Sequence, residues 1–263
     1  PTIEQFSYRV KALQLSFGLE GNVSVPRLSV QIRPERIPLS YAQQRLWFLD
    51  QLFPNQSVYN IPQAFRLRGA FSIDAFESSI KYLVDRHEVL RTRIGIHEGN
   101  GYQEVLRTEN FRISVEDISQ ELEDDRYTYI ESTIEEEAGY RFKLDQDWLF
   151  RVRVIHEMQD VHVVLITMHH IISDGWSFDI FFKELKEVYG IYNKGEEPKL
   201  EELRVQYADY AIWQREWLKG ERLEQQLAYW KEQLTGALEA IELPTDYKRP
   251  KELTYEGGIY TTE

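Results

Sequence analysis

The chain has 263 residues, of which 42% are hydrophobic and 13% aromatic, so it can bury the core of one large domain or two small ones. Asp and Glu outnumber Lys and Arg by 44 to 31, and the net charge of −13 repels nucleic-acid phosphates and anionic membranes, so neither is an expected partner. Cysteine is absent, which excludes disulfides, a thiol nucleophile and a cysteine-based metal site and fits a reducing cytoplasm.

The first third of the chain alternates helical and strand patterns. Residues 1–35 mix Pro, Ser and Arg with isolated apolar positions, so we expect a linker or a loosely attached arm. Ser40 then caps a helix, because apolar residues follow it at three- and four-residue spacing until Pro54 stops the pattern. The alternation at 64–69 predicts a half-buried strand, and the apolar stripe within 76–84 predicts a second helix.

The remaining elements complete a mixed pattern. Two short strands, 89–96 and 102–106, flank the sequence EGNG, whose Asn-Gly pair favours a tight hairpin turn. Two β-rich runs lie within 149–170, and the second is apolar on both parities, which is typical of a central strand covered on both faces. Helical patterns are expected around 125–139, 178–192 and 222–234. These elements predict an α/β protein in the broad sense, an α+β sandwich in which a mixed sheet packs against helices.

The sequence MHHIISDGWS at 168–177 places polar residues directly after the predicted central strand. Side chains alternate along a strand, so His169 and His170 point to opposite faces and only one of them can approach a reacting atom. A neutral imidazole accepts protons well near pH 7, and the backbone of Gly175 admits close approach of a substrate. The structural alternative is that both imidazoles are satisfied polar groups at a strand end and Asp174 caps the next helix.

HHIISDG resembles the HHxxxDG signature of condensation domains from nonribosomal peptide synthetases. Three further stretches are similar to this family in the same order: SYAQQRLWFLDQL at 40–52, RHEVLRTRI at 86–94 and YADYAIWQRE at 207–216. The chain starts at proline rather than methionine and has no signal segment, so we expect a cytoplasmic piece of a longer polypeptide. The resemblance implies three segments: a linker or arm after an upstream carrier domain at 1–35, an N-terminal lobe at 36–250, and the start of the crossover to a missing C-terminal lobe at 251–263.

The resemblance also implies a fold and a reaction. The family has two lobes that resemble chloramphenicol acetyltransferase, set in a V around a tunnel, and this chain matches the first lobe. The implied reaction is amide formation, in which the amine of a carrier-bound aminoacyl thioester attacks a carrier-bound aminoacyl or peptidyl thioester. Both substrates hang on 4′-phosphopantetheine arms of upstream and downstream peptidyl carrier domains, so the chain is expected to bind no cofactor or metal of its own. We expect the half-domain to fold but to be inactive alone.

By this resemblance, His170 faces the tunnel and Gly175 lies beside it. An α-amino group has a pKa of about 8, so a substantial share is already neutral near pH 7. General-base catalysis supplies about 10²–10⁴, whereas alignment of two reactants reaches effective molarities of about 10⁵–10⁸ M. We therefore expect His170 to position the amine first and to accept a proton second.

The other motif residues are expected to support the site. By resemblance His169 and Asp174 hold the turn, and an anion behind the motif needs a cation, for which Arg86 is favoured over Arg91. The acidic run at 135–137 is expected to be a solvated helix face, which is a poor docking surface for acidic carriers. Five further residues are similar to the family: Arg45, Trp47, Tyr207, Asp209 and Trp213. The aromatic residues among them are expected in the core, because aromatic residues at helical spacing are more often core than site.

Alternative functions share part of this pattern. A coenzyme A-dependent acyltransferase shares the HxxxDG chemistry, but RHEVLRT and YADYAIWQ favour the peptide-synthetase branch. A non-catalytic module that recruits carriers is a second alternative, although such modules often lose the histidine that is intact here. Epimerisation domains also share HHxxxDG, and HHIISDGWS is more similar to the condensation type that takes an L-configured donor.

Overall fold

A four-stranded sheet forms the centre of the lobe in the computed structural model, which describes residues 25–237 and 244–248. Its strand order is β2-β7-β6-β5, with β5 parallel to β6 and the other pairs antiparallel. The strands are β2 (Asn60–Arg68), β5 (Ser114–Asp117), β6 (Phe150–Met158) and β7 (Val161–His169). A smaller antiparallel sheet has the order β1-β4-β3 and consists of β1 (Ile37–Pro38), β3 (Thr92–His97) and β4 (Asn100–Val105).

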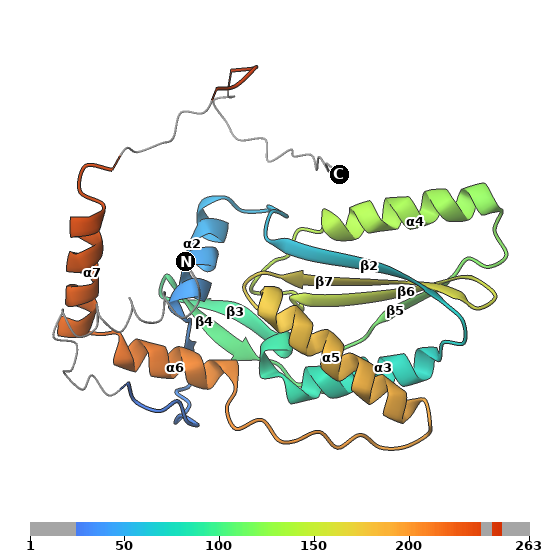
Figure 1. Ribbon diagram of the computed structural model, residues 1–263, viewed down its shortest axis with the longest axis horizontal. Coiled ribbons are helices and arrows are strands. Elements are labelled where there is room, and N and C mark those ends of the chain that lie inside the picture. The colour runs from blue at the N-terminus through green and yellow to red at the C-terminus, as the bar shows by residue number, and fades with distance from the viewer. Residues whose placement is uncertain (1–24, 238–243, 249–263) are drawn as a thin grey trace, which may run out of the picture.

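Helices cover both faces of the larger sheet. Figure 1 shows α3 (Ile73–Arg86) and α5 (Gly175–Tyr192) on one face and α4 (Glu123–Ala138) on the other. Alternate residues of β7 enter two separate cores: Val164 and Ile166 pack in the core that contains α3 and α5, whereas Val163 and Leu165 pack in the core that contains α4. The prediction of a central strand covered on both faces is therefore confirmed, as is the mixed α/β fold class.

The remaining helices lie at the end of the larger sheet where β7 ends. They are α2 (Tyr41–Leu52), α6 (Tyr207–Trp217) and α7 (Glu221–Gln233), with short 3₁₀ turns at Glu88–Arg91 and Thr108–Asn110. Ser40 caps α2 as predicted, because its side chain accepts the Gln43 N–H while the Gln43 side chain accepts the Ser40 N–H. Helix α6 packs against α2 and β1.

Two details of the predicted strands were wrong. The hairpin turn is at Glu98 and Gly99, whose φ angles are 49° and 73°, and Asn100 already pairs with His97. A two-residue turn with positive φ at both positions matches the twist of the strands that it joins. The strand register therefore places the turn two residues earlier than the Asn-Gly sequence at 100–101 predicts. The stretch 89–91 is a 3₁₀ turn rather than a strand. Strands β1 and β5 were not predicted, because each is too short to show a period.

The described part of the N-terminal arm is fastened to α6 instead of being loosely attached. Asp209 is only 1% exposed, and its carboxylate accepts the backbone N–H of Gln31 at 3.0 Å and lies 3.4 Å from the Arg33 guanidinium. Arg33 also pairs with Glu88 at 2.6 Å. Trp213 Nε1 donates to the Pro26 carbonyl at 2.9 Å. A buried carboxylate needs such donors, and the arm supplies them.

Candidate active site

A cavity of about 370 Å³ opens beside the residues that follow β7. Helix α2 contributes Leu46 to its apolar wall, and the polar wall includes His170, Asp174 and Tyr207. The sequence brings these groups together because β7 ends at His169 and α5 begins only six residues later at Gly175. The short turn is therefore fixed at one end by β7 and at the other end by α5.

His170 is exposed and lines the cavity directly after the end of β7. Its backbone N–H donates to the Tyr59 carbonyl at 2.7 Å, which fixes the main chain. Its ring Nδ1 lies 2.7 Å from the Ser173 carbonyl oxygen. Because a carbonyl oxygen only accepts hydrogen bonds, Nδ1 must carry the proton. The neutral ring therefore keeps the lone pair on Nε2, where it can accept a hydrogen bond or a proton.

His169 is buried, and its ring has the opposite proton arrangement. The Ile171 N–H donates to its Nδ1 at 3.1 Å, so the proton of the neutral ring is on Nε2. Burial, aided by the nearby His170, lowers the pKa of His169 to about 4, and the ring is therefore uncharged at neutral pH. It packs edge-on against Phe142, with the ring centres 5.9 Å apart. His169 and His170 thus separate as predicted, one into the core and one toward the cavity.

Asp174 caps α5, as the structural alternative for this residue predicted. Its Oδ1 accepts the Ser177 backbone N–H at 2.9 Å and the Ser177 hydroxyl at 2.7 Å. These hydrogen bonds hold the pKa of Asp174 below its ordinary value. The carboxylate is exposed and sits at a helix N-terminus, whose free N–H groups and dipole stabilise its charge.

The predicted ion pair of Asp174 with an arginine was therefore wrong. Arg86 Nε lies 3.1 Å from Glu184 Oε2 of α5, and Arg91 donates to the Leu106 carbonyl at 2.8 Å. The prediction assumed a buried carboxylate that needs a cation, whereas Asp174 is exposed and already has donors. Arg86 supports the lobe by joining α3 to α5, and Arg91 secures the 3₁₀ turn.

Gly175 is the first residue of α5, and a Cβ atom placed on it would meet nothing within 4 Å. Protein packing therefore does not require glycine at this position. The space that the missing side chain leaves is open, but Gly175 is not among the residues that line the cavity beside His170.

Sequence reasoning missed the polar contacts that hold the turn after β7. Gln43 is only 1% exposed, and its Nε2 donates to the Ile171 carbonyl at 3.3 Å and lies 3.5 Å from Gln103 Oε1. The sequence feature that could have revealed these contacts is a glutamine three residues before Leu46, on the apolar face of the helix. Tyr207, which was expected in the core, lines the cavity, and so does Arg45.

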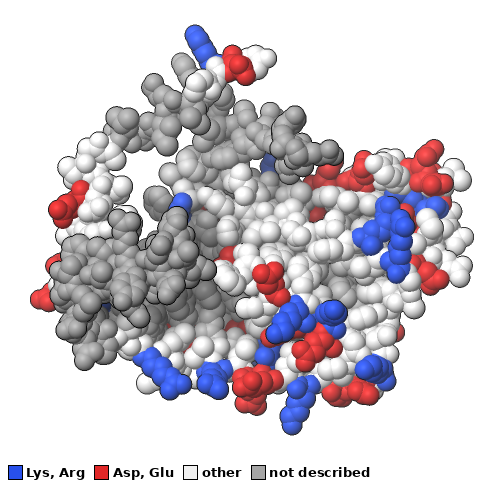
Figure 2. Space-filling view, viewed as in Figure 1, with Lys and Arg blue, Asp and Glu red and all other residues white. Residues whose placement is uncertain are grey.

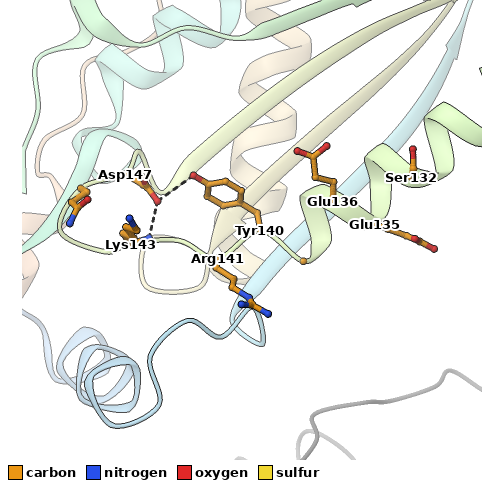
Figure 3. A pocket seen from close by; sticks show the side chains of 9 residues that line it. Ser132, Glu135, Glu136, Tyr140, Arg141, Lys143 and Asp147 are labelled. Carbon is orange, nitrogen blue, oxygen red and sulfur yellow. Dashed lines mark hydrogen bonds between the residues drawn. The ribbon is translucent and has the colours of Figure 1, made fainter.

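A larger and shallower hollow of about 760 Å³ lies at the C-terminal end of α4 (Figure 3). Asp147 organises it by accepting the Lys143 backbone N–H at 2.8 Å and the Tyr140 hydroxyl at 3.3 Å. Glu135 and Glu136 line it and are exposed, as expected for a solvated helix face. The third acid of the run differs, because Glu137 is buried and pairs with Arg151 at 2.7 Å.

On the face that Figure 2 shows, the charged side chains of the described residues are mixed in sign. Figure 2 shows Lys and Arg interspersed with Asp and Glu near the rim of the face that carries α5, while the middle of that face is mostly uncharged. Within residues 25–237 and 244–248, no three His, Asp or Glu side chains are grouped so that they could bind a metal ion. Among the described helices, none is both long and apolar enough to cross a bilayer.

Comparisons with known proteins identify the family. Residues 34–263 match the family model described as "Condensation domain". A linear gramicidin synthase polypeptide of Brevibacillus parabrevis is 43% identical over 266 residues, which cover 100% of this chain and 3% of that protein. Malpibaldin synthetase of Mortierella alpina is 38% identical over 260 residues, which cover 98% of this chain and 5% of that protein. The chain thus spans a small fraction of the length of these relatives.

Solved structures agree with this match. The complex of the X-domain and OxyB from teicoplanin biosynthesis superposes with a TM-score of 0.77 at 30% identity, over 88% of this chain and 50% of that chain. The starter condensation domain of rhizomide synthetase has a TM-score of 0.69 at 20% identity, over 78% of this chain and 49% of that chain, and shows the shared fold. This chain belongs to the condensation-domain family of nonribosomal peptide synthetases and corresponds to the N-terminal portion of the domain. It spans about half the length of these solved relatives. Condensation domains are amide-bond-forming acyltransferases.

Proposed function

We propose that this lobe supplies the histidine-bearing wall of a site that joins two carrier-bound thioesters by an amide bond. The observation that carries the proposal is the proton arrangement of His170. Its Nδ1 proton is held by the Ser173 carbonyl at 2.7 Å, and its Nε2 lone pair is left for a substrate in a cavity of about 370 Å³.

The chemistry follows from that lone pair. Nε2 of His170 accepts a hydrogen bond from the substrate amine, which orients the nitrogen lone pair toward the thioester carbonyl carbon. The C–N bond forms, and His170 takes one proton from the tetrahedral adduct. The C–S bond then breaks, and the proton passes to the departing thiolate of the donor arm. Asp174 and His169 keep the turn in place and take no part in proton transfer.

The substrates and partners extend this proposal beyond the lobe. Both thioesters are carried on 4′-phosphopantetheine arms of upstream and downstream peptidyl carrier domains, in the cytoplasm. Residues 1–35 join the upstream carrier, residues 36–250 form the lobe, and residues 251–263 lead to a C-terminal lobe that supplies the opposite wall. The donor is L-configured, because HHIISDGWS is similar to that subtype.

The test uses the complete two-lobed domain with loaded donor and acceptor carriers. We expect His170→Ala to abolish most dipeptidyl-carrier formation, measured by mass spectrometry, while the melting temperature stays close to that of the unchanged protein. Near-normal product formation by a folded His170→Ala domain would overturn the assignment. D- and L-configured donors supplied in parallel test the subtype, and free coenzyme A thioesters test the alternative acyl carrier.

A second candidate function is protein recruitment without catalysis. It is favoured by one observation, the likeness at 30% identity to an X-domain in complex with OxyB. A recruiting module would bind its partner equally well with His170 or alanine, and it would form no amide. Product formation that depends on His170 therefore distinguishes the two candidates.

A further inference from the structure

A pair of hydroxyl groups joins the N-terminus of α2 to α6, and one of the two, that of Tyr207, belongs to a residue that lines the cavity. Ser40 Oγ and Tyr207 Oη lie 2.9 Å apart, and Ser40 is completely buried. Ser40 Oγ also accepts the Gln43 backbone N–H at 3.1 Å as the cap of α2. Tyr207 is the first residue of α6 and lines the cavity together with His170.

The direction of the hydrogen bond between the two hydroxyls follows from the burial of Ser40. A buried hydroxyl proton needs an acceptor, because a buried donor that is left unpaired destabilises the folded protein. Within residues 25–237 and 244–248, Tyr207 Oη is the acceptor within reach of Ser40 Oγ. Ser40 therefore donates to Tyr207. The proton of Tyr207 itself is then left over, and in the same part of the chain no protein acceptor lies within hydrogen-bond distance of it.

The same network fixes both the tyrosine and the histidine turn. The ring of Tyr207 packs on that of Tyr210, with centres 5.5 Å apart. Gln43, which closes the cap on Ser40, holds the carbonyl of Ile171, the residue after His170. Burial raises the pKa of Tyr207, so the phenol keeps its proton at neutral pH. The lobe thus presents a fixed acceptor, His170 Nε2, and a fixed donor, the Tyr207 hydroxyl, to one cavity.

We propose that the Tyr207 hydroxyl is a substrate-positioning group that donates a hydrogen bond to a carbonyl oxygen of the carrier-bound acyl-phosphopantetheine. This inference rests on the proposed function, since it takes the same thioester as ligand. The thioester carbonyl and the amide carbonyls of the arm share the required chemistry. The Tyr207 hydroxyl fixes the bound substrate while His170 Nε2 orients the amine.

The test compares Tyr207→Phe with Tyr210→Phe in the complete domain. Tyr210 is on the same helix, but its hydroxyl accepts from Gln214 Nε2 at 2.9 Å and does not line the cavity. The probes are an aminoacyl-pantetheine thioester, the thioether analogue that lacks the thioester carbonyl, and bare pantetheine. Dissociation constants are measured by calorimetry. We expect Tyr207→Phe to weaken thioester binding by about 2- to 10-fold and Tyr210→Phe to leave it unchanged.

The ratio of the affinity for the thioester to the affinity for the thioether distinguishes a direct contact between Tyr207 and the substrate from a purely structural role of Tyr207. If Tyr207 contacts the thioester carbonyl, this ratio falls to about one in Tyr207→Phe; if it contacts an arm amide, bare pantetheine loses the same factor. If Tyr207 has a purely structural role, Tyr207→Phe should weaken the binding of all three probes equally and lower the melting temperature, while the ratio stays unchanged. In that case the affinity for bare pantetheine should fall no more in Tyr207→Phe than in Ser40→Ala. Should Tyr207→Phe not fold, the ¹³Cζ resonance of Tyr207 in the unchanged protein must shift on thioester addition while that of Tyr210 does not.

Unchanged binding of every probe by a folded Tyr207→Phe domain would overturn the inference. That result leaves the proposed function standing if His170→Ala still loses turnover. Conversely, full turnover by His170→Ala with an altered Tyr207→Phe binding ratio would overturn the proposed function and keep the carbonyl contact.

Discussion

His169 and His170 are neighbours in the chain, yet their rings carry protons on opposite nitrogens. The Ile171 N–H fixes the proton of His169 on Nε2, and the Ser173 carbonyl fixes the proton of His170 on Nδ1. The turn after β7 therefore carries one imidazole that is buried in the core and one that lines the cavity and can accept a hydrogen bond or a proton. The two side chains should respond differently to every perturbation that reaches them.

Truncation of each histidine tests this division. We expect His169→Ala to lower the free energy of unfolding by about 1–3 kcal/mol, because the Ile171 N–H loses its buried acceptor. His170→Ala should change it by about 0.5 kcal/mol or less, since the ring is exposed. Urea denaturation of both variants measures the difference. Equal losses would contradict the separation of the two faces.

Acid should destabilise the lobe through His169. Its pKa is about 4 in the folded protein and 6.5 when unperturbed, so the unfolded chain binds the proton first as the pH falls. The stabilising contribution is complete above pH 6.5 and is lost as the pH falls from 6.5 to about 4, by roughly 3 kcal/mol in total. Denaturation curves at several pH values should show this slope, and His169→Gln should lack it.

Asp174 should behave as a helix cap and not as the partner of an arginine. Asp174→Ala is expected to cost about 0.5–2 kcal/mol, and Asp174→Asn, which can still accept the Ser177 N–H, much less. A double-mutant cycle with Arg86→Ala should give no coupling to Asp174. The matched cycle of Arg86→Ala with Glu184→Gln should give clear coupling, because those side chains lie 3.1 Å apart.

Gly175 allows stability to be separated from substrate access. Gly175→Ala adds a methyl group that meets no protein atom within 4 Å, and alanine favours helix over glycine by up to about 1 kcal/mol. We expect an unchanged or slightly raised melting temperature. If a substrate approaches the backbone at Gly175, product formation in the complete domain should fall, because the methyl group takes up that open space. A variant that is both stable and fully active would show that substrates do not approach the backbone there.

How far the sequence predicts this molecule depends on the range of the interactions. The burial of β7 on both faces is local information, since both parities of that run are apolar. The cap at Ser40 is local as well. The Asp174 prediction failed because charge is visible in a sequence but exposure is not. The hairpin turn was displaced because strand register overrode the preference of one Asn-Gly pair.

The contacts that hold the candidate site could not be predicted from the sequence, because their partners lie far apart in the chain. Gln43 meets Ile171 across 128 positions, and Gln31 meets Asp209 across 178. No periodicity within one segment can reveal such a partner. A buried glutamine on an apolar helix face shows only that a partner exists.

The fastening of the arm to Asp209 bears on where this domain can be exchanged between synthetases. A chimera joined at Pro34 would replace the segment of Gln31 and Arg33, and unless the new segment supplies the same donors, the Asp209 carboxylate, 1% exposed, would keep its donor from Gln206 at 2.8 Å. Asp209 is two residues from Tyr207, so the damage would be done at the first turn of α6, on the cavity wall. The transferable unit therefore starts upstream of Pro26, and a fusion point chosen by family similarity alone cuts through it.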